Sequence, residues 1–262
     1  MFKSRMLGVF SALVYLFLYA PIVVLVIFSF DESRLGVNWT GFTFKWYQSL
    51  LGDENVLAAL RNSLIVALCA VAIATVMGVL AAVGLDKLTK KRAGLLAGGL
   101  RGLIILPVLV PEIAMAVSAL LLFISAGLPL GLTSVIAAHV VFCLSYVTMT
   151  VQARLEGLNP QLEEAALDLG LTPWQAFFRV TLPLLLPGII SGALLAFVLS
   201  LDDFVITQFT AGVGATTLPL RIYSMVKFGV SPEINALSTL MLITTLLIAA
   251  LSEFIARRSK VA

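Results

Sequence analysis

Six long apolar runs restrict what this 262-residue sequence can fold into. They cover residues 7–30, 62–85, 103–122, 133–150, 186–207 and 236–255. A hydrocarbon core of about 30 Å takes about 20 helical residues to cross, so each run is long enough to span it. The runs are continuous rather than alternating, which predicts helices instead of a barrel. With 60% hydrophobic and 12% charged residues, the chain is expected to be an all-α integral membrane protein surrounded by lipid.

The distribution of Lys and Arg predicts the orientation, because positively charged loops stay in the cytoplasm. With both termini cytoplasmic, the inside set is Lys3, Arg5, Lys87, Lys90, Lys91, Arg92, Arg101, Arg154, Arg179, Arg257, Arg258 and Lys260. The outside set is smaller and consists of Arg34, Lys45, Arg61, Arg221 and Lys227. This distribution predicts a multi-pass membrane protein with residues 155–183 in the cytoplasm. The first run exceeds the length of a signal-peptide core and is expected to stay as a span.

Residues 155–183 interrupt the apolar pattern with a polar stretch that has helix start and stop signals. Asn159, followed by proline, is typical of a helix start, and Gly170 can adopt the left-handed conformation that ends a helix. Thr172 and Gln175 have the spacing of a capping box. The loop is therefore predicted to form a helix, a glycine turn and a second helix.

Two surfaces of this predicted hairpin suit a soluble protein partner. Ala165 and Ala166 are small, so a partner could approach the first helix closely. Trp174, Phe177 and Phe178 give the second helix an apolar face. The alternative is a plain connector whose alanines only pack within the protein.

The hairpin resembles the EAA motif of ABC importer permeases. The matching positions are Glu164, Ala165, Ala166, Gly170, Val180, Leu182 and Pro183, with Val180 where isoleucine is usual. The resemblance implies a type I importer permease in the bacterial inner membrane, with a bundle of six transmembrane helices. It also implies that the loop docks on a cytoplasmic ATPase. The coupling residues would then be Glu164, Ala165, Ala166, Gly170 and Pro183.

Three further segments, residues 42–51, 59–64 and 200–240, resemble the permeases of spermidine and putrescine importers. This resemblance implies a polyamine substrate that a periplasmic solute-binding protein delivers. It also implies a second, homologous permease as heterodimer partner and two ATPase subunits. Permeases for other small solutes share parts of these segments, so an importer of another solute is the alternative.

Three carboxylates lie inside apolar runs, where ionisable residues are costly and are functional candidates. They are Glu112, Asp202 and Asp203. A polyamine needs carboxylates and aromatic faces along its path, so these residues suit a substrate pathway. The alternative for Glu112 is a hydrogen-bonded carboxyl that holds a kink between Pro107 and Pro111. The alternative for the aspartates is structural bracing.

Helical periodicity favours Asp203 over Asp202 as the pathway residue. Asp203 shares one predicted helix face with Ser200, Thr207 and Thr210, whereas Asp202 lies toward an apolar flank. The fourth run carries a similar stripe, formed by His139, Phe142, Cys143, Tyr146 and Thr150. His139 is interpreted as an interhelical hydrogen-bonding residue. The expected pathway comprises Asp203, Asp202, Glu112, Tyr146 and Phe142.

Several motifs are missing from the sequence, and their absence limits its chemistry. There is no G-x-x-x-x-G-K-[ST] loop, so ATP and Mg are expected in a partner ATPase and no cofactor in this chain. Hydrolase and metal-site spacings are also missing, so the chain is expected to be neither an enzyme nor a metal protein. The net charge of +3 follows from the loop bias and predicts no nucleic-acid partner. An ion-coupled secondary transporter is the other alternative, although residues 1–130 and 131–262 show no convincing repeat.

Overall fold

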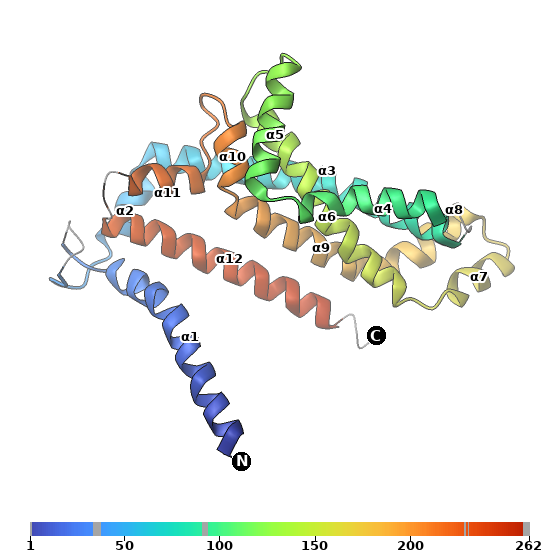
Figure 1. Cartoon of the computed structure of the whole chain (residues 1–262), viewed down its shortest axis with the longest axis horizontal. Helices are drawn as coiled ribbons and strands as arrows, with labels where there is room; N and C mark the ends of the chain where they lie inside the picture. Colours follow the sequence, from blue (N-terminus) through green and yellow to red (C-terminus); the bar gives the residue numbers. More distant parts are fainter. Residues whose placement is uncertain (1, 34–37, 91–93, 228, 230, 259–262) are drawn as a thin grey trace. The chain divides into compact units, whose positions relative to one another are not determined.

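The computed structural model describes residues 2–33, 38–90, 94–227, 229 and 231–258. Across these ranges the chain is helical apart from loops and one isolated bridge between Asp31 and Phe42. Four residues of the predicted charge distribution lie outside them: Arg34, Lys91, Arg92 and Lys260. The helices are α1 (Phe2–Phe28), α2 (Lys45–Gly52), α3 (Glu54–Lys90), α4 (Gly94–Leu109), α5 (Glu112–Ser125), α6 (Leu132–Glu156), α7 (Gln161–Asp168), α8 (Pro173–Ala176), the π-helical turn η1 (Phe177–Thr181), α9 (Leu182–Asp202), α10 (Val205–Thr210), α11 (Leu218–Val226) and α12 (Pro232–Arg258) (Figure 1).

Five stretches of the described chain are helical, long and apolar enough to cross a membrane, and α4 with α5 makes a sixth if that bent pair is one span. The five are Met6–Phe28, Glu54–Thr89, Leu132–Glu156, Pro173–Asp202 and Pro232–Ile255. Large hydrophobic side chains such as Phe17 and Leu103 are exposed along the helices, as a lipid-facing surface requires. The expected all-α membrane fold is confirmed.

Two of the expected spans are not single straight helices. The run over residues 103–122 is split, because α4 and α5 meet at an angle of 106° around Val110 and Pro111. Proline lacks a backbone N–H and disfavours helical geometry in the residue before it, which explains the break. The run over residues 186–207 is also interrupted, because α9 ends at Asp202 and α10 begins at Val205.

The helix continues through both Pro183 and Pro187, although a proline inside a helix often ends or bends it. Pro183 lies in the first turn of α9, where a missing N–H costs little. The preceding turn is π-helical, and the N–H of Leu182 bonds the carbonyl of Phe177, five residues earlier. This π-helical turn joins α8 to α9, so Pro173–Asp202 forms one continuous helical stretch.

The chain forms two compact units, and each has its own interior. Unit 1 comprises Met1–Ala59 and Leu220–Thr244, and unit 2 comprises Leu60–Pro219 and Thr245–Ala262. Stacked and edge-on aromatic rings fill part of unit 1, where Phe30 contacts Phe42, Phe44 and Tyr47. The EAA loop (residues 155–183) and all the pathway residues predicted from the sequence belong to unit 2.

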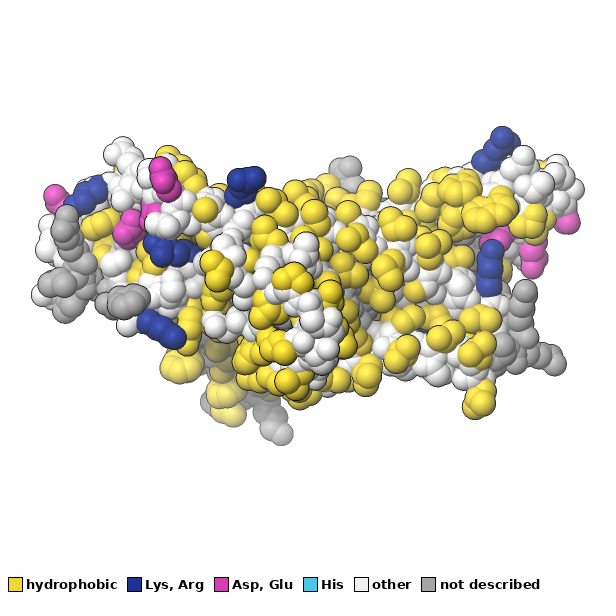
Figure 2. Space-filling model, turned by 90° about the horizontal axis from the view of Figure 1, so that it is seen from above, with side chains coloured by type: hydrophobic (Ala, Val, Ile, Leu, Met, Phe, Trp, Pro, Cys, Tyr) yellow, Lys and Arg dark blue, Asp and Glu magenta, His cyan; other side chains and the backbone are white. Residues whose placement is uncertain are grey.

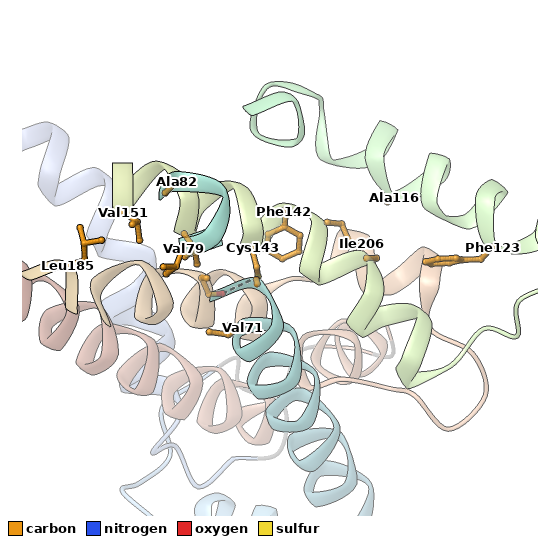
Figure 3. Close-up of a cluster of buried hydrophobic side chains, with 14 residues drawn as sticks. Val71, Val79, Ala82, Ala116, Phe123, Phe142, Cys143, Val151, Leu185 and Ile206 are labelled. Carbon is orange, nitrogen blue, oxygen red and sulfur yellow. Dashed lines mark hydrogen bonds between the residues drawn. The ribbon is translucent and has the colours of Figure 1, made fainter. Parts of the chain in front are cut away.

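The core of unit 2 lies where α6 packs against α9. Figure 3 shows Phe142 and Cys143 of α6 in the same apolar cluster as Leu185 and Ile206. A side chain at Gly188 would come within 2.7 Å of Arg154, so the two helices approach too closely for anything larger than glycine. In Figure 2 the visible face of α4 and α5 is mainly hydrophobic, whereas charged side chains gather at the end of unit 2 that carries α7 and α8.

Candidate substrate pathway and EAA loop

A cleft of about 360 Å³ lies between α4, α5, α6, α9 and α10 in unit 2. Four of the five predicted pathway residues line this carboxylate cleft: Glu112, Phe142, Tyr146 and Asp203. The remaining lining residues are Pro107, Val108, Val110, Met115, Leu199 and Ile206. Asp202, the fifth predicted pathway residue, is exposed at the end of α9 and is not among them. Two carboxylates and two aromatic rings therefore converge on one space, and no Lys or Arg is among the described residues that line it.

Asp203 occupies the break between α9 and α10 and caps the shorter helix. Its Oδ1 accepts the backbone N–H of Ile206 at 3.2 Å. Its Oδ2 accepts the backbone N–H and the hydroxyl of Thr207, each at 2.8 Å. An aspartate in this position satisfies N–H groups that the first turn of a helix leaves without partners. The side chain is only 2% exposed, so the carboxylate is held by donors while it borders the cleft.

His139 links α6 to both sides of this break. Its Nδ1 lies 2.8 Å from Ser200 Oγ on α9. Its Nε2 lies 3.1 Å from Asp203 Oδ2 and 3.1 Å from Thr207 Oγ1 on α10. The imidazole is fully buried, and both ring nitrogens have partners. The contacts agree with the interpretation of His139 as an interhelical hydrogen-bonding residue.

Glu112 differs from Asp203 in exposure although both carboxylates face the cleft. It is the first residue of α5, directly after the break at Pro111, and it is exposed. Its carboxylate interacts electrostatically with that of Asp203. A carboxylate at a helix N-terminus is favourably placed relative to the helix dipole. Glu112 thus brings a solvent-accessible carboxyl group beside one that is already engaged.

The EAA loop folds as the capping signals predict. Asn159 Oδ1 accepts the N–H of Gln161 at 3.0 Å, and α7 begins there, one residue later than expected. The φ angle of Gly170 is +89°, the left-handed conformation that terminates a helix. Thr172 and Gln175 exchange hydrogen bonds of 3.0 and 3.4 Å in a capping box that starts α8.

The predicted coupling residues are not equivalent in this loop. Ala166 is buried, whereas Glu164, Ala165, Gly170 and Pro183 are exposed. The adjacent carboxylate, Glu163, is half-buried and accepts the Thr181 hydroxyl at 3.2 Å, which joins α7 to the end of η1. The hairpin is thus held from inside and leaves one side of α7 free.

Exposed aromatic rings lie on the second half of the hairpin, in α8 and η1. Trp174 and Phe178 stack with their ring centroids 5.7 Å apart, and their exposed fractions are 71% and 55%. Phe177 meets Phe178 edge-on and is half-buried. The apolar face predicted for the second helix is therefore only partly used in packing, and a large aromatic surface remains exposed.

Other contacts in unit 2 had no signal in the sequence. Arg154 donates from Nε to the carbonyl of Leu184 at 3.1 Å, which ties the start of α9 to the end of α6. Its aliphatic stem packs where Gly188 leaves room. The sequence indicated Arg154 only as a cytoplasmic charge. Its contact with Leu184 joins residues 30 positions apart in the sequence, and such a contact leaves no periodic pattern.

Unit 1 also contains a buried carboxylate that the sequence did not single out. Asp31 Oδ1 accepts the backbone N–H of Thr40 at 2.8 Å and its hydroxyl at 3.1 Å. The Thr40 N–H is the largest influence on the carboxyl and holds its pKa below the ordinary value, against the opposing effect of burial. The Asp31 carbonyl accepts Trp46 Nε1 at 2.7 Å, so this residue organises the loop after α1.

Comparison with known proteins identifies the family. Residues 74–260 match the binding-protein-dependent transport system inner membrane component family. The spermidine/putrescine transport system permease protein PotC of Escherichia coli (strain K12) is 40% identical over 250 residues, which cover 95% of this chain and 93% of PotC. The putrescine transport system permease protein PotI of the same strain is 45% identical over 232 residues, 86% of this chain and 82% of PotI.

A solved structure has the same fold. It is a bacterial alginate ABC transporter in complex with an alginate pentasaccharide-bound periplasmic protein. The TM-score is 0.74 at 19% identity, and the alignment covers 98% of this chain and 94% of that one. Together with the match over most of the sequence, this confirms the predicted type I importer permease fold. The chain belongs to the family of binding-protein-dependent transport system inner membrane components.

Proposed function

We propose that this protein is the membrane-spanning subunit of an ATP-driven polyamine importer and that putrescine or spermidine passes along the carboxylate cleft. The observation that carries the proposal is the convergence of Glu112 and Asp203 with Phe142 and Tyr146 on one space, where the part of the chain that the structure describes places no Lys or Arg. A polyamine carries ammonium groups on an apolar chain, and carboxylates and aromatic faces are the groups that attract it. PotC and PotI, with 40% and 45% identity, support the same substrate class.

The difference between the two carboxylates suits transport rather than tight binding. A pathway must attract its substrate and still release it. The charge of Asp203 is shared among the donors of His139 and α10, whereas Glu112 is accessible. Glu112 would therefore attract the ammonium group of a polyamine strongly, and Asp203 would attract it more weakly. Asp202 stays in the proposal as an outer charge, since it is exposed one residue before the cleft.

The proposal includes partners that supply energy and substrate. ATP and Mg would be held by two ATPase subunits that dock on Glu164, Ala165, Ala166, Gly170 and Pro183 of the EAA loop. A second, homologous permease would complete the pathway as a heterodimer, and a periplasmic solute-binding protein would deliver the polyamine. This arrangement requires both termini and residues 155–183 to lie in the cytoplasm.

The test is uptake by the complete complex in proteoliposomes, with radiolabelled putrescine and spermidine and ATP supplied on the side of the ATPases. Uptake should require both ATP and the binding protein. Glu112→Gln should lower it about tenfold at limiting substrate while ATP hydrolysis continues, since one ammonium partner is lost. The matched control is Glu54→Gln, which neutralises an exposed carboxylate that does not line the cleft.

Three results would contradict the proposal. Uptake of a solute other than a polyamine would leave an importer with a different substrate. Uptake driven by an ion gradient without ATP would favour a secondary transporter. Cysteines placed in the EAA loop that react only with periplasmic reagents would reverse the orientation and remove the ATPase site.

A further inference from the structure

The network around Asp203 requires a proton on one particular nitrogen of His139. Nε2 faces two oxygens, Asp203 Oδ2 and Thr207 Oγ1, each at 3.1 Å. The Thr207 hydroxyl already donates to Asp203 Oδ2 at 2.8 Å, so toward the ring it offers only a lone pair. Nε2 must therefore be a donor. Nδ1 faces Ser200 Oγ, whose hydroxyl can donate to it, and a neutral ring with the proton on Nε2 satisfies all these groups.

This ring fixes more than one carboxylate. Its three partners lie before, within and after the break between α9 and α10, and they are Ser200, Asp203 and Thr207. On the same helix, one and two turns further along, Phe142 and Tyr146 line the cleft. The rings of His139 and Phe142 are in contact, with centroids 5.1 Å apart. His139 thus fixes the position of the Asp203 carboxylate relative to Phe142 and Tyr146, the two aromatic rings that a cation in the cleft would pass.

We propose that His139 is a positioning residue for cation passage. It acts as a neutral imidazole that donates a hydrogen bond from Nε2 to Asp203. This bond fixes the position of the break between α9 and α10 relative to the rings of Phe142 and Tyr146 on α6. The inference rests on the proposed function, which is ATP-driven import of a polyamine along the carboxylate cleft. A purely structural histidine would support assembly and stability and nothing else. A positioning histidine also affects how much substrate enters for each ATP hydrolysed.

The first experiment determines the tautomer without any transport. The chain contains one histidine, so ¹⁵N-histidine labelling of the full chain in lipid bilayers gives one pair of ring signals. We expect a neutral ring protonated on Nε2 at pH 7.5, and ring signals that move in Asp203→Asn. A ring protonated on Nδ1, or signals unaffected by Asp203→Asn, would overturn the inference.

The second experiment separates positioning from structure in the complete reconstituted complex. His139→Leu removes the donor and should lower polyamine uptake per ATP hydrolysed about tenfold, the scale of a lost hydrogen bond to a charged group. His139→Gln should restore it to within about twofold, because its amide nitrogen reaches the position of Nε2 and can donate to Asp203. His139→Asn should not, because its shorter amide matches Nδ1 and serves Ser200 instead.

A matched control comes from another buried hydrogen bond of α6. Ser145 Oγ donates to the carbonyl of Ile104 at 2.6 Å, and Ser145 does not line the cleft. Ser145→Ala should lower thermal stability and leave uptake per ATP unchanged. The same pattern in His139→Leu, or equal uptake by the Gln and Asn variants, would reduce His139 to a structural role. If His139→Leu does not assemble, the comparison of uptake per ATP between the His139→Gln and His139→Asn variants still decides the inference. Absence of polyamine uptake in the unmodified complex would instead refute the proposed function.

Discussion

In both the carboxylate cleft and the EAA loop, one acidic side chain is engaged in local structure and another is accessible. In the cleft, Asp203 is buried and caps α10, whereas Glu112 is exposed. In the loop, Glu163 accepts the Thr181 hydroxyl, whereas Glu164 is exposed on α7. Acidic residues of one region can therefore differ in role even when they lie close together. What separates them is the number of donors within reach, because a carboxylate that is already hydrogen-bonded has less attraction left for a ligand.

The largest effect should come from neutralising the engaged carboxylate of the cleft. Asp203→Asn replaces one carboxylate oxygen, which accepts hydrogen bonds, by an NH₂ group, which donates them. The buried N–H and hydroxyl groups that donate to the carboxylate would then face another donor or lose their acceptor. We expect a loss of about 2–4 kcal/mol in stability together with loss of uptake. Thermal unfolding in detergent and uptake in proteoliposomes measure the two effects.

Glu112→Gln sharpens this contrast, because it should reduce uptake without lowering the unfolding temperature. If Asp203→Asn keeps normal stability and also keeps polyamine uptake at limiting substrate, Asp203 is neither a brace nor a pathway carboxylate. The distinction between engaged and accessible carboxylates would then fail for the cleft.

A pair of alanine substitutions tests the same distinction in the loop. Ala166→Glu places a carboxylate in the buried position of α7 and should destabilise the hairpin by about 2–3 kcal/mol. Ala165→Glu places it on the exposed side, so it should leave thermal stability unchanged and abolish co-purification with the ATPase. Equal effects of the two variants on stability would show that the exposed side of α7 is used in folding rather than docking.

An intermediate effect is expected where the loop meets the spans. Gly188→Val would drive a branched side chain into Arg154, which holds the carbonyl of Leu184. We expect destabilisation of about 1–3 kcal/mol, measured by thermal unfolding. Gly98→Ala is the matched control, since nothing lies within 4 Å of the added carbon. A Gly188→Val protein as stable as the control would show that the close packing of α6 on α9 is dispensable.

The smallest effect is expected for the engaged carboxylate of unit 1. The pKa of Asp31 is lower in the folded protein, so its contribution to stability is present above the ordinary value near 4 and is lost as the pH falls through the lower folded value. Hydrogen-exchange protection of the Thr40 amide should therefore decrease below about pH 4. In Asp31→Asn the protection should be weaker and independent of pH in this range. A protection that is unchanged by acid would contradict the role given to this carboxylate.

The sequence by itself determined the membrane fold, the position of the EAA loop and its caps, and four of the residues that line the cleft. These features depend on apolar length, on helix-ending residues and on local spacing, all of which act within a few residues along the chain. Gly170 and the capping box of Thr172 with Gln175 took the predicted conformations for this reason.

Only the tertiary structure decided how the acidic residues divide their roles. Periodicity placed Asp203 on a polar face but treated the fifth span as one helix, whereas the carboxylate caps a second helix after a break. The donors that engage it come partly from His139, 64 residues away along the chain. A hydrogen bond between distant segments depends on which helices pack together, and local sequence patterns carry no information on that packing.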